Sequence, residues 1–159
     1  MIRRLALVVA LATVFALAIG PAASAAGIAN TGDLKVVQVE LSSRRVHPGT
    51  VFTITIRSEN KGPSSTLWDQ TETVPDWFNV IGTQCALGIS SDGTFCEYGA
   101  DPDPHLGEDL TTIYTVQVLT EGVVLGPTNV TLCVSNEEIA FIDRNLANNC
   151  KSKTVTVVP

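Results

Sequence analysis

The stretch Asp101-Pro102-Asp103-Pro104-His105 carries the side chains of this sequence that are most able to hold a metal ion. Oxygen ligands at alternating positions suit a hard cation such as calcium. However, the two prolines impose an extended course, and no glycine-containing loop wraps these ligands around one ion. We therefore interpret the stretch as a solvated acidic loop, keep Asp101, Asp103 and His105 as weak metal candidates, and predict no bound metal and no cofactor.

The nucleophiles and bases of the chain do not indicate a catalytic site. His47 and His105 are the two histidines, and His47 directly precedes the turn residues Pro48-Gly49. The sequence contains no Gly-x-Ser-x-Gly motif, which would place a serine nucleophile on a sharp turn between a strand and a helix. We therefore expect no catalytic residues and a protein that is not an enzyme.

The four cysteines are expected to form disulfides rather than a zinc site, because no C-x-x-C unit is present. Three pairings are possible. We favour the two local pairs, since each spans a turn-rich stretch between strand-like segments. In an oxidising compartment each bond would stabilise the fold by about 3 kcal/mol. The favoured pairs are Cys85 with Cys96 and Cys133 with Cys150.

A candidate partner-binding loop lies between the last two cysteines. It contains the consecutive apolar residues Ile139-Ala140-Phe141-Ile142, which would be costly to leave in water. These side chains either fold back onto the core, which we favour, or contact a partner. The candidate residues are Glu137, Glu138, Ile139, Phe141 and Ile142.

The first 26 residues are typical of a secretory signal peptide. Arg3 and Arg4 precede a 15-residue apolar run from Leu5 to Ile19, which is shorter than a membrane-spanning helix needs. Ala23-Ser24-Ala25 supplies the cleavage pattern, so we expect cleavage after Ala25 or Ala26. Residues 27–32 would then form a flexible lead-in, and residues 33–159 one domain.

The charge of the chain bears on its partners, its oligomeric state and its location. The chain has 159 residues with 10 Lys and Arg, 16 Asp and Glu, and a net charge of -6, which argues against nucleic-acid binding. Without the leader the net charge is more negative still, so we expect copies to repel one another and the protein to be a monomer. We also expect no membrane span after cleavage and a secreted, extracellular protein, either free or associated with the cell surface.

From Asp33 onward, apolar residues recur at every second position, which predicts β-strands. In the clearest case Phe52, Ile54 and Ile56 would face a core, while the threonines between them face water. About seven to eight such strands, separated by Gly and Pro turns, favour an all-β, immunoglobulin-like antiparallel β-sandwich. Periodicity alone leaves a barrel or a jelly roll open.

Three stretches make the chain resemble a known family, the immunoglobulin-like domain repeated in bacterial surface and secreted proteins that is called domain of unknown function 11. Residues 48–64 end in Asn-Lys-Gly-Pro-Ser, similar to the Asn-x-Gly-Pro-Ser of the family. Cys85 and Cys96 are placed like its frequent cysteine pair, and Asp143 to Asn149 is similar to its closing Asp-x-Asn-x-x-Asn-Asn. The resemblance implies a sandwich without catalytic activity. Unlike tandem members of the family, this chain has one copy and adds Cys133 and Cys150.

These observations predict a non-enzymatic module that acts in binding or adhesion, or as a structural component, at or near the bacterial cell surface. The partner would be a protein or a surface polymer, with no nucleic acid. The alternatives are a small-ligand carrier of the same fold and a secreted protease inhibitor.

Intact-mass spectrometry of the secreted protein tests the leader and the disulfides together. We expect the mass of a chain that begins at Ala26 or Gly27, less four hydrogens, with the four hydrogens regained on reduction. A mass that retains residues 1–25 would contradict the signal peptide.

Overall fold

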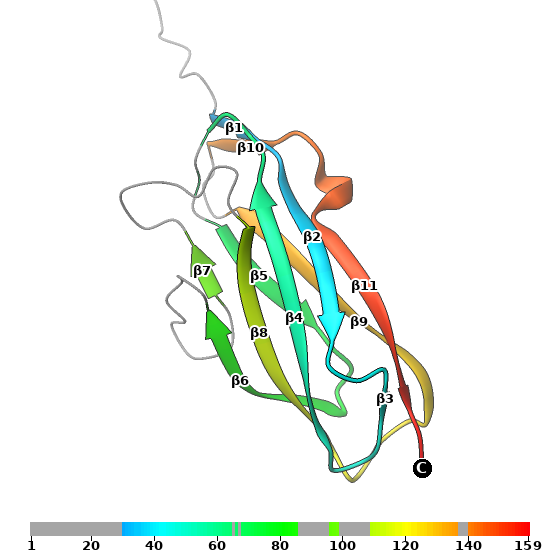
Figure 1. The fold of residues 1–159 in the computed structure, drawn as a ribbon. Helices are drawn as coiled ribbons and strands as arrows, with labels where there is room; N and C mark the ends of the chain where they lie inside the picture. The colour runs from blue at the N-terminus through cyan, green and yellow to red at the C-terminus, as the bar shows by residue number, and fades with distance from the viewer. Residues whose placement is uncertain (1–29, 65, 67, 86–95, 99–108, 137–139) are drawn as a thin grey trace, which may run out of the picture.

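The computed structural model describes residues 30–64, 66, 68–85, 96–98, 109–136 and 140–159 (Figure 1). The expected leader, residues 1–26, lies outside them. Within the described residues, no helix has the length and apolar character needed to cross a membrane.

Two sheets face each other and form the body of the fold (Figure 1). One has four antiparallel strands in the order β2 (Leu34–Leu41), β4 (Val51–Asn60), β8 (Asp109–Val118), β6 (Phe78–Cys85). The other has five strands in the order β3 (Arg45–Val46), β11 (Cys150–Val157), β9 (Gly126–Asn136), β5 (Trp68–Thr73), β7 (Cys96–Tyr98).

This strand order is that of an immunoglobulin sandwich. The four-stranded sheet corresponds to its first, second, fifth and fourth strands, and β11-β9-β5 to its seventh, sixth and third. The short strand β3 leaves the first sheet and pairs in parallel with β11 of the second. The predicted all-β, immunoglobulin-like sandwich is therefore confirmed.

One end of the sandwich is closed by a small third sheet and a turn. β1 (Asn30–Gly32) pairs in parallel with β10 (Phe141–Asp143). A single 3-10 turn, η1 (Leu146–Asn148), follows before β11.

Strand alternation builds the core as the sequence predicted. Phe52, Ile54 and Ile56 are buried in β4, and the residues between them are partly exposed. Trp68 is buried, whereas Trp77 is half-buried and packs against the edge of the core. The largest fully buried side chains come from both sheets: Trp68, Tyr114, Leu34, Ile54, Ile56, Leu110, Leu132 and Gln70.

A polar network lies inside this apolar core and joins the two sheets. The fully buried Gln70 of β5 donates through Nε2 to Ser58 Oγ of β4 and to the Leu110 carbonyl oxygen of β8, the latter over 3.2 Å. Thr112 donates its hydroxyl to Gln70 Oε1, and the Tyr114 hydroxyl donates to the Gln70 carbonyl oxygen over 2.6 Å. Each polar atom of the Gln70 side chain therefore has a partner in the facing sheet, as burial requires.

The two disulfides form the favoured pairs. Cys85 at the end of β6 bonds Cys96 at the start of β7, with Cα atoms 5.7 Å apart, and so ties the last strand of one sheet to the last strand of the other. Cys133 and Cys150 are directly opposite residues of β9 and β11, with Cα atoms 4.1 Å apart.

Replacing Gln70 with leucine tests the inter-sheet network. The two side chains have similar size, so the main loss is the hydrogen bonds of buried Ser58 and Thr112, and we expect the free energy of unfolding to fall by about 3 kcal/mol. Urea denaturation followed by circular dichroism measures this.

The triple variant Gln70→Leu, Ser58→Ala, Thr112→Val is the control. It also removes the two hydroxyls that lose Gln70 as a partner, so part of the lost stability should return. A triple variant less stable than Gln70→Leu would contradict this account.

Candidate functional site

A groove opens where the edge of one sheet meets the edge of the other. β2 and β11 lie side by side there, and the Lys151 ammonium of β11 donates to the Val37 carbonyl oxygen of β2 over 2.7 Å (Figure 1). The groove has a volume of about 300 Å³. It is lined by four β2 residues, one residue of the β2–β3 connection and one residue of β11: Gln38, Val39, Glu40, Leu41, Arg44 and Lys153.

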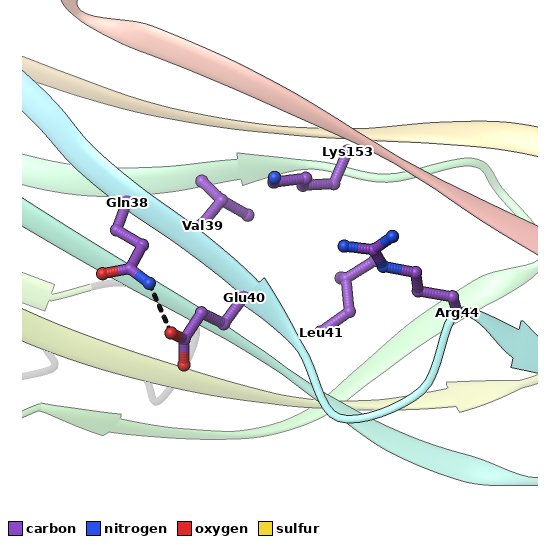
Figure 2. Close-up of a pocket in the computed structure, with 6 residues that line it drawn as sticks. All are labelled: Gln38, Val39, Glu40, Leu41, Arg44 and Lys153. Atoms are coloured by element: carbon purple, nitrogen blue, oxygen red, sulfur yellow. Dashed lines mark hydrogen bonds between the residues drawn. The ribbon is translucent and has the colours of Figure 1, made fainter.

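Strand alternation in β2 divides these side chains into two groups. Figure 2 shows Val39 and Leu41 pointing toward β11, with the head groups of Arg44 and Lys153 on the same side. Gln38 and Glu40 point the other way, and the Gln38 amide donates to the Glu40 carboxylate (Figure 2). The groove therefore combines an apolar floor with two cationic groups.

The two cations of the groove are not neutralised within the part of the chain that the structure describes, where neither Arg44 nor Lys153 has a carboxylate partner. The nearby Glu40 is engaged with Gln38 instead, and Gln38 also accepts from Arg57 Nη1 over 3.1 Å. An unpaired guanidinium and an unpaired ammonium above an apolar floor suit an anionic group such as a carboxylate.

Arg45 and Lys151 extend this positive region along β3 and β11. Both are exposed, as are Arg44 and Lys153. We call Arg44, Arg45, Lys151 and Lys153 the cationic edge. It is the part of the described surface where cations gather without acidic partners.

The cations outside the cationic edge have local partners. Lys35 and Lys61 each place Nζ 3.6 Å from a carboxylate oxygen of Glu59. The negative charge of Glu59 contributes to raising the pKa of Lys61. Arg144 donates to the Thr31 hydroxyl over 2.8 Å.

The Asp-x-Asn-x-x-Asn-Asn segment at the closed end of the sandwich forms a hydrogen-bonded turn. Asp143 Oδ1 accepts from the Asn145 backbone N–H over 2.9 Å. Asp143 Oδ2 accepts from the Asn149 amide over 2.9 Å and from the Leu34 backbone N–H over 3.3 Å. Both carboxylate oxygens are thus occupied by donors of the protein itself.

The Asn-Lys-Gly-Pro-Ser stretch contacts the same N-terminal segment, residues 31–34, that Asp143 contacts. Asn60 Oδ1 accepts from the Gly62 N–H over 2.9 Å, and Asn60 Nδ2 donates to the Ser64 carbonyl oxygen over 3.1 Å. A Cβ on Gly62 would lie 1.9 Å from Gly32 Cα, so only glycine fits there. The two motifs shared with the resembled family therefore both hold residues 31–34 in place.

The predicted partner-binding loop is placed only in part. Phe141 is buried, and its ring packs against Gly32, so this residue folds back onto the core. Ile142 is 53% exposed. Glu137, Glu138 and Ile139 lie outside the described residues.

The metal candidates Asp101, Asp103 and His105 also lie outside the described residues. Among the residues that are described, no three His, Cys, Asp or Glu side chains come close enough to hold a metal ion. The other histidine, His47, places Nδ1 2.6 Å from the Pro159 carbonyl oxygen and so fastens the end of the chain.

The groove is not evident from the amino-acid sequence. Arg44 and Lys153 are far apart in the sequence, and neither belongs to a motif. The distribution of charge carries a signal for this clustering of cations, because no Lys or Arg occurs between Lys61 and Arg144.

Comparison with known proteins supports the fold. A CARDB domain from Pyrococcus furiosus, described in complex with di-metal ions, is 16% identical with a TM-score of 0.51, over 80% of this chain and 89% of that one. The cupredoxin domain of amoB from Nitrosocaldus yellowstonii is 7% identical with a TM-score of 0.49, over 80% of this chain and 88% of that one. No protein-family model and no curated protein matches the chain.

Substituting Asp143 with alanine tests the structural role of the closing turn. The change leaves the Leu34 and Asn145 N–H groups and the Asn149 amide without their acceptor, so we expect a loss of about 3 kcal/mol in the free energy of unfolding. Glu121→Ala, in an exposed loop, serves as the control and should change stability little.

Calcium distinguishes a turn from a metal site at the same position. We expect the Tm of the wild-type protein to be the same with and without millimolar calcium. A calcium-dependent rise in Tm that Asp143→Ala abolishes would contradict the structural assignment.

Proposed function

We propose that this chain is a secreted, non-enzymatic, immunoglobulin-like module that binds an anionic partner at or near the surface of a bacterial cell. The groove between β2 and β11 is its binding site. Within this proposal the chain is a member of the domain of unknown function 11 type, on the strength of the Asn-x-Gly-Pro-Ser and Asp-x-Asn-x-x-Asn-Asn motifs.

An extracellular location is supported by the chemistry of the chain. Two disulfides persist in oxidising compartments, and residues 1–26 have the pattern of a cleavable leader. The bonds hold both the β6–β7 edge and the β9–β11 pair, which keeps the frame rigid outside the cell.

The observation that carries the proposal is that two cations of one groove, in an otherwise acidic protein, have no carboxylate partner among the described residues. Arg44 and Lys153 lie beside the apolar side chains of Val39 and Leu41 and carry charges of the same sign. A carboxylate or phosphate in the groove would form charge-assisted hydrogen bonds with both.

A non-enzymatic role agrees with the lining of the groove. Its one acid, Glu40, is held by Gln38 and points away from the two cations (Figure 2). We do not extend the proposal to a carrier of apolar ligands, because such sites are enclosed and mainly apolar, whereas four of the six lining residues here are polar or charged.

Binding to washed cells of the secreting bacterium tests the proposal. Fluorescently labelled mature protein should bind them at low salt and be released by high salt. The variant Arg44→Gln, Lys153→Gln should bind at least about tenfold more weakly, because two charge-assisted hydrogen bonds are lost.

The matched control is Lys35→Gln, Lys61→Gln, which changes the net charge equally but only breaks exposed ion pairs with Glu59. It should bind like the wild type. Equal weakening of both variants would show that net charge, rather than the groove, governs binding.

A further inference from the structure

Three cations of the cationic edge form a row that is longer than the groove. Lys151 and Lys153 are two residues apart in β11, so their Cα atoms lie about 7 Å apart and their side chains share one side of the strand. Lys151 donates to the Val37 carbonyl oxygen, which shows that this side faces β2. Arg44 continues the row, because its carbonyl oxygen accepts from the Thr156 N–H. We call Lys151, Lys153 and Arg44 the cationic row, which extends over about 17 Å of β11.

A single small anion in the groove leaves part of the cationic row without a partner. Arg44 and Lys153 line the groove, but Lys151 does not, since its ammonium lies farther along β2 at the Val37 carbonyl oxygen. Hydrogen bonds need a donor–acceptor distance of about 3 Å, so one carboxylate is too small to bind three cations spread along the strand. An extended chain that carries an anionic group at each level can bind all three.

The opposite face of β11 presents hydroxyl groups. Ser152 and Thr154 alternate with the lysines and are exposed. The Ser152 hydroxyl lies 2.7 Å from the Thr131 hydroxyl of β9, and the Thr154 hydroxyl donates to Asn129 Oδ1 over 2.9 Å. A hydroxyl has one donor and two acceptor positions, so these groups can accept further hydrogen bonds from a ligand that is itself rich in hydroxyls.

The described part of this edge lacks the apolar anchors of a protein interface. Such interfaces centre on aromatic or large apolar side chains and are depleted of lysine. Val39 is buried, and none of the exposed large apolar side chains among the described residues belongs to β2, β3 or β11. A row of cations beside hydroxyls therefore favours a hydrated, polar chain over a folded protein. Basic clusters of this kind are typical of sites for anionic polysaccharides.

We propose that the partner is an acidic polysaccharide that lies along β11, with its carboxylates against the cationic row and its hydroxyls against Ser152 and Thr154. This inference rests on the proposed function of the groove and names its partner. Each carboxylate forms charge-assisted hydrogen bonds with one or two cations. Because a single exposed ion pair contributes little, binding depends on several contacts made by one chain.

Binding of galacturonate oligomers to the mature protein is the direct measurement, because every sugar of this polymer carries a carboxylate. In about 20 mM salt, isothermal titration calorimetry should show an affinity at least about tenfold higher for polygalacturonate than for galacturonate, and no binding of either in about 500 mM salt. The affinity should rise with length until the oligomer spans about 17 Å. Equal affinity per carboxylate for the monomer and the polymer would overturn the proposal.

Lys151→Gln separates the cationic row from the groove. It should weaken polygalacturonate binding about fivefold and leave galacturonate binding unchanged, since the monomer lies between Arg44 and Lys153. Arg44→Gln should weaken both. Lys61→Gln is the matched control, because it removes the same charge from an exposed ion pair with Glu59, and it should bind both ligands like the wild type. Polygalacturonate binding that is insensitive to Lys151→Gln would overturn the proposal.

Two other polymers test the chemistry of the partner. Polyglutamate with the same number of carboxylates has no hydroxyls and should bind at least about fivefold more weakly than polygalacturonate, and dextran, which has no charge, should not bind. The variant Ser152→Ala, Thr154→Ala should weaken polygalacturonate binding and leave polyglutamate binding unchanged. Polyglutamate that binds as tightly as polygalacturonate would identify an acidic peptide as the partner and overturn the proposal.

Competition on washed cells separates this inference from the proposed function. Polygalacturonate should release the bound protein, and galacturonate at the same carboxylate concentration should not. Far-UV circular dichroism checks that each variant is folded. If cell binding depends on the groove while polygalacturonate neither binds nor competes, this inference fails and the proposed function stands. If neither cell binding nor polygalacturonate binding depends on the groove, both fail.

Discussion

The side-chain amide of Gln70 fixes how the two sheets of this protein face each other. Two sheets that meet only through apolar side chains can shift relative to each other, because one buried methyl group packs about as well as another. A buried amide opposes such a shift, since the loss of one partner leaves a polar atom without a hydrogen bond. Gln70 takes its partners from β4 and β8, the two central strands of the facing sheet, so it sets the position of β5 and, through pairing, of β9 and β11.

With the centre fixed in this way, the two side edges differ in how they are closed. The Cys85–Cys96 bond joins the sheets covalently at β6 and β7. At the opposite edge only the short β3 crosses between them, and it covers β11 at Thr156 and Val157 alone. The first half of β11 is consequently exposed, and the groove forms there. The groove is thus a consequence of how far β3 extends, rather than of any special loop.

Much of this fold could be predicted from the sequence because its long strands alternate strictly. The alternation of Phe52, Ile54 and Ile56 predicted a strand with one buried face, and these residues form the buried face of β4. The two- and three-residue strands β1, β3 and β10 were not predicted, since such short segments show no period and depend on tertiary hydrogen bonds such as that from Arg144 N–H to the Gly32 carbonyl oxygen. The groove was missed for a related reason: strand order brings Arg44 and Lys153 together, and local patterns carry no information about that order.

The chemistry of the open edge favours ion pairing over strand addition as its mode of binding. An uncovered strand invites pairing with any other chain, and natural proteins oppose this with charged residues, lysine above all, that point inward at the edge. Lys151 and Lys153 fit that description, because they alternate in β11 with the same register as the buried Val155 and Val157, yet remain exposed. The same two lysines, with Arg44 beside them, attract carboxylates. One set of side chains can therefore repel indiscriminate β-pairing and select an acidic partner, which explains why cations are concentrated at this edge in a protein that is acidic elsewhere.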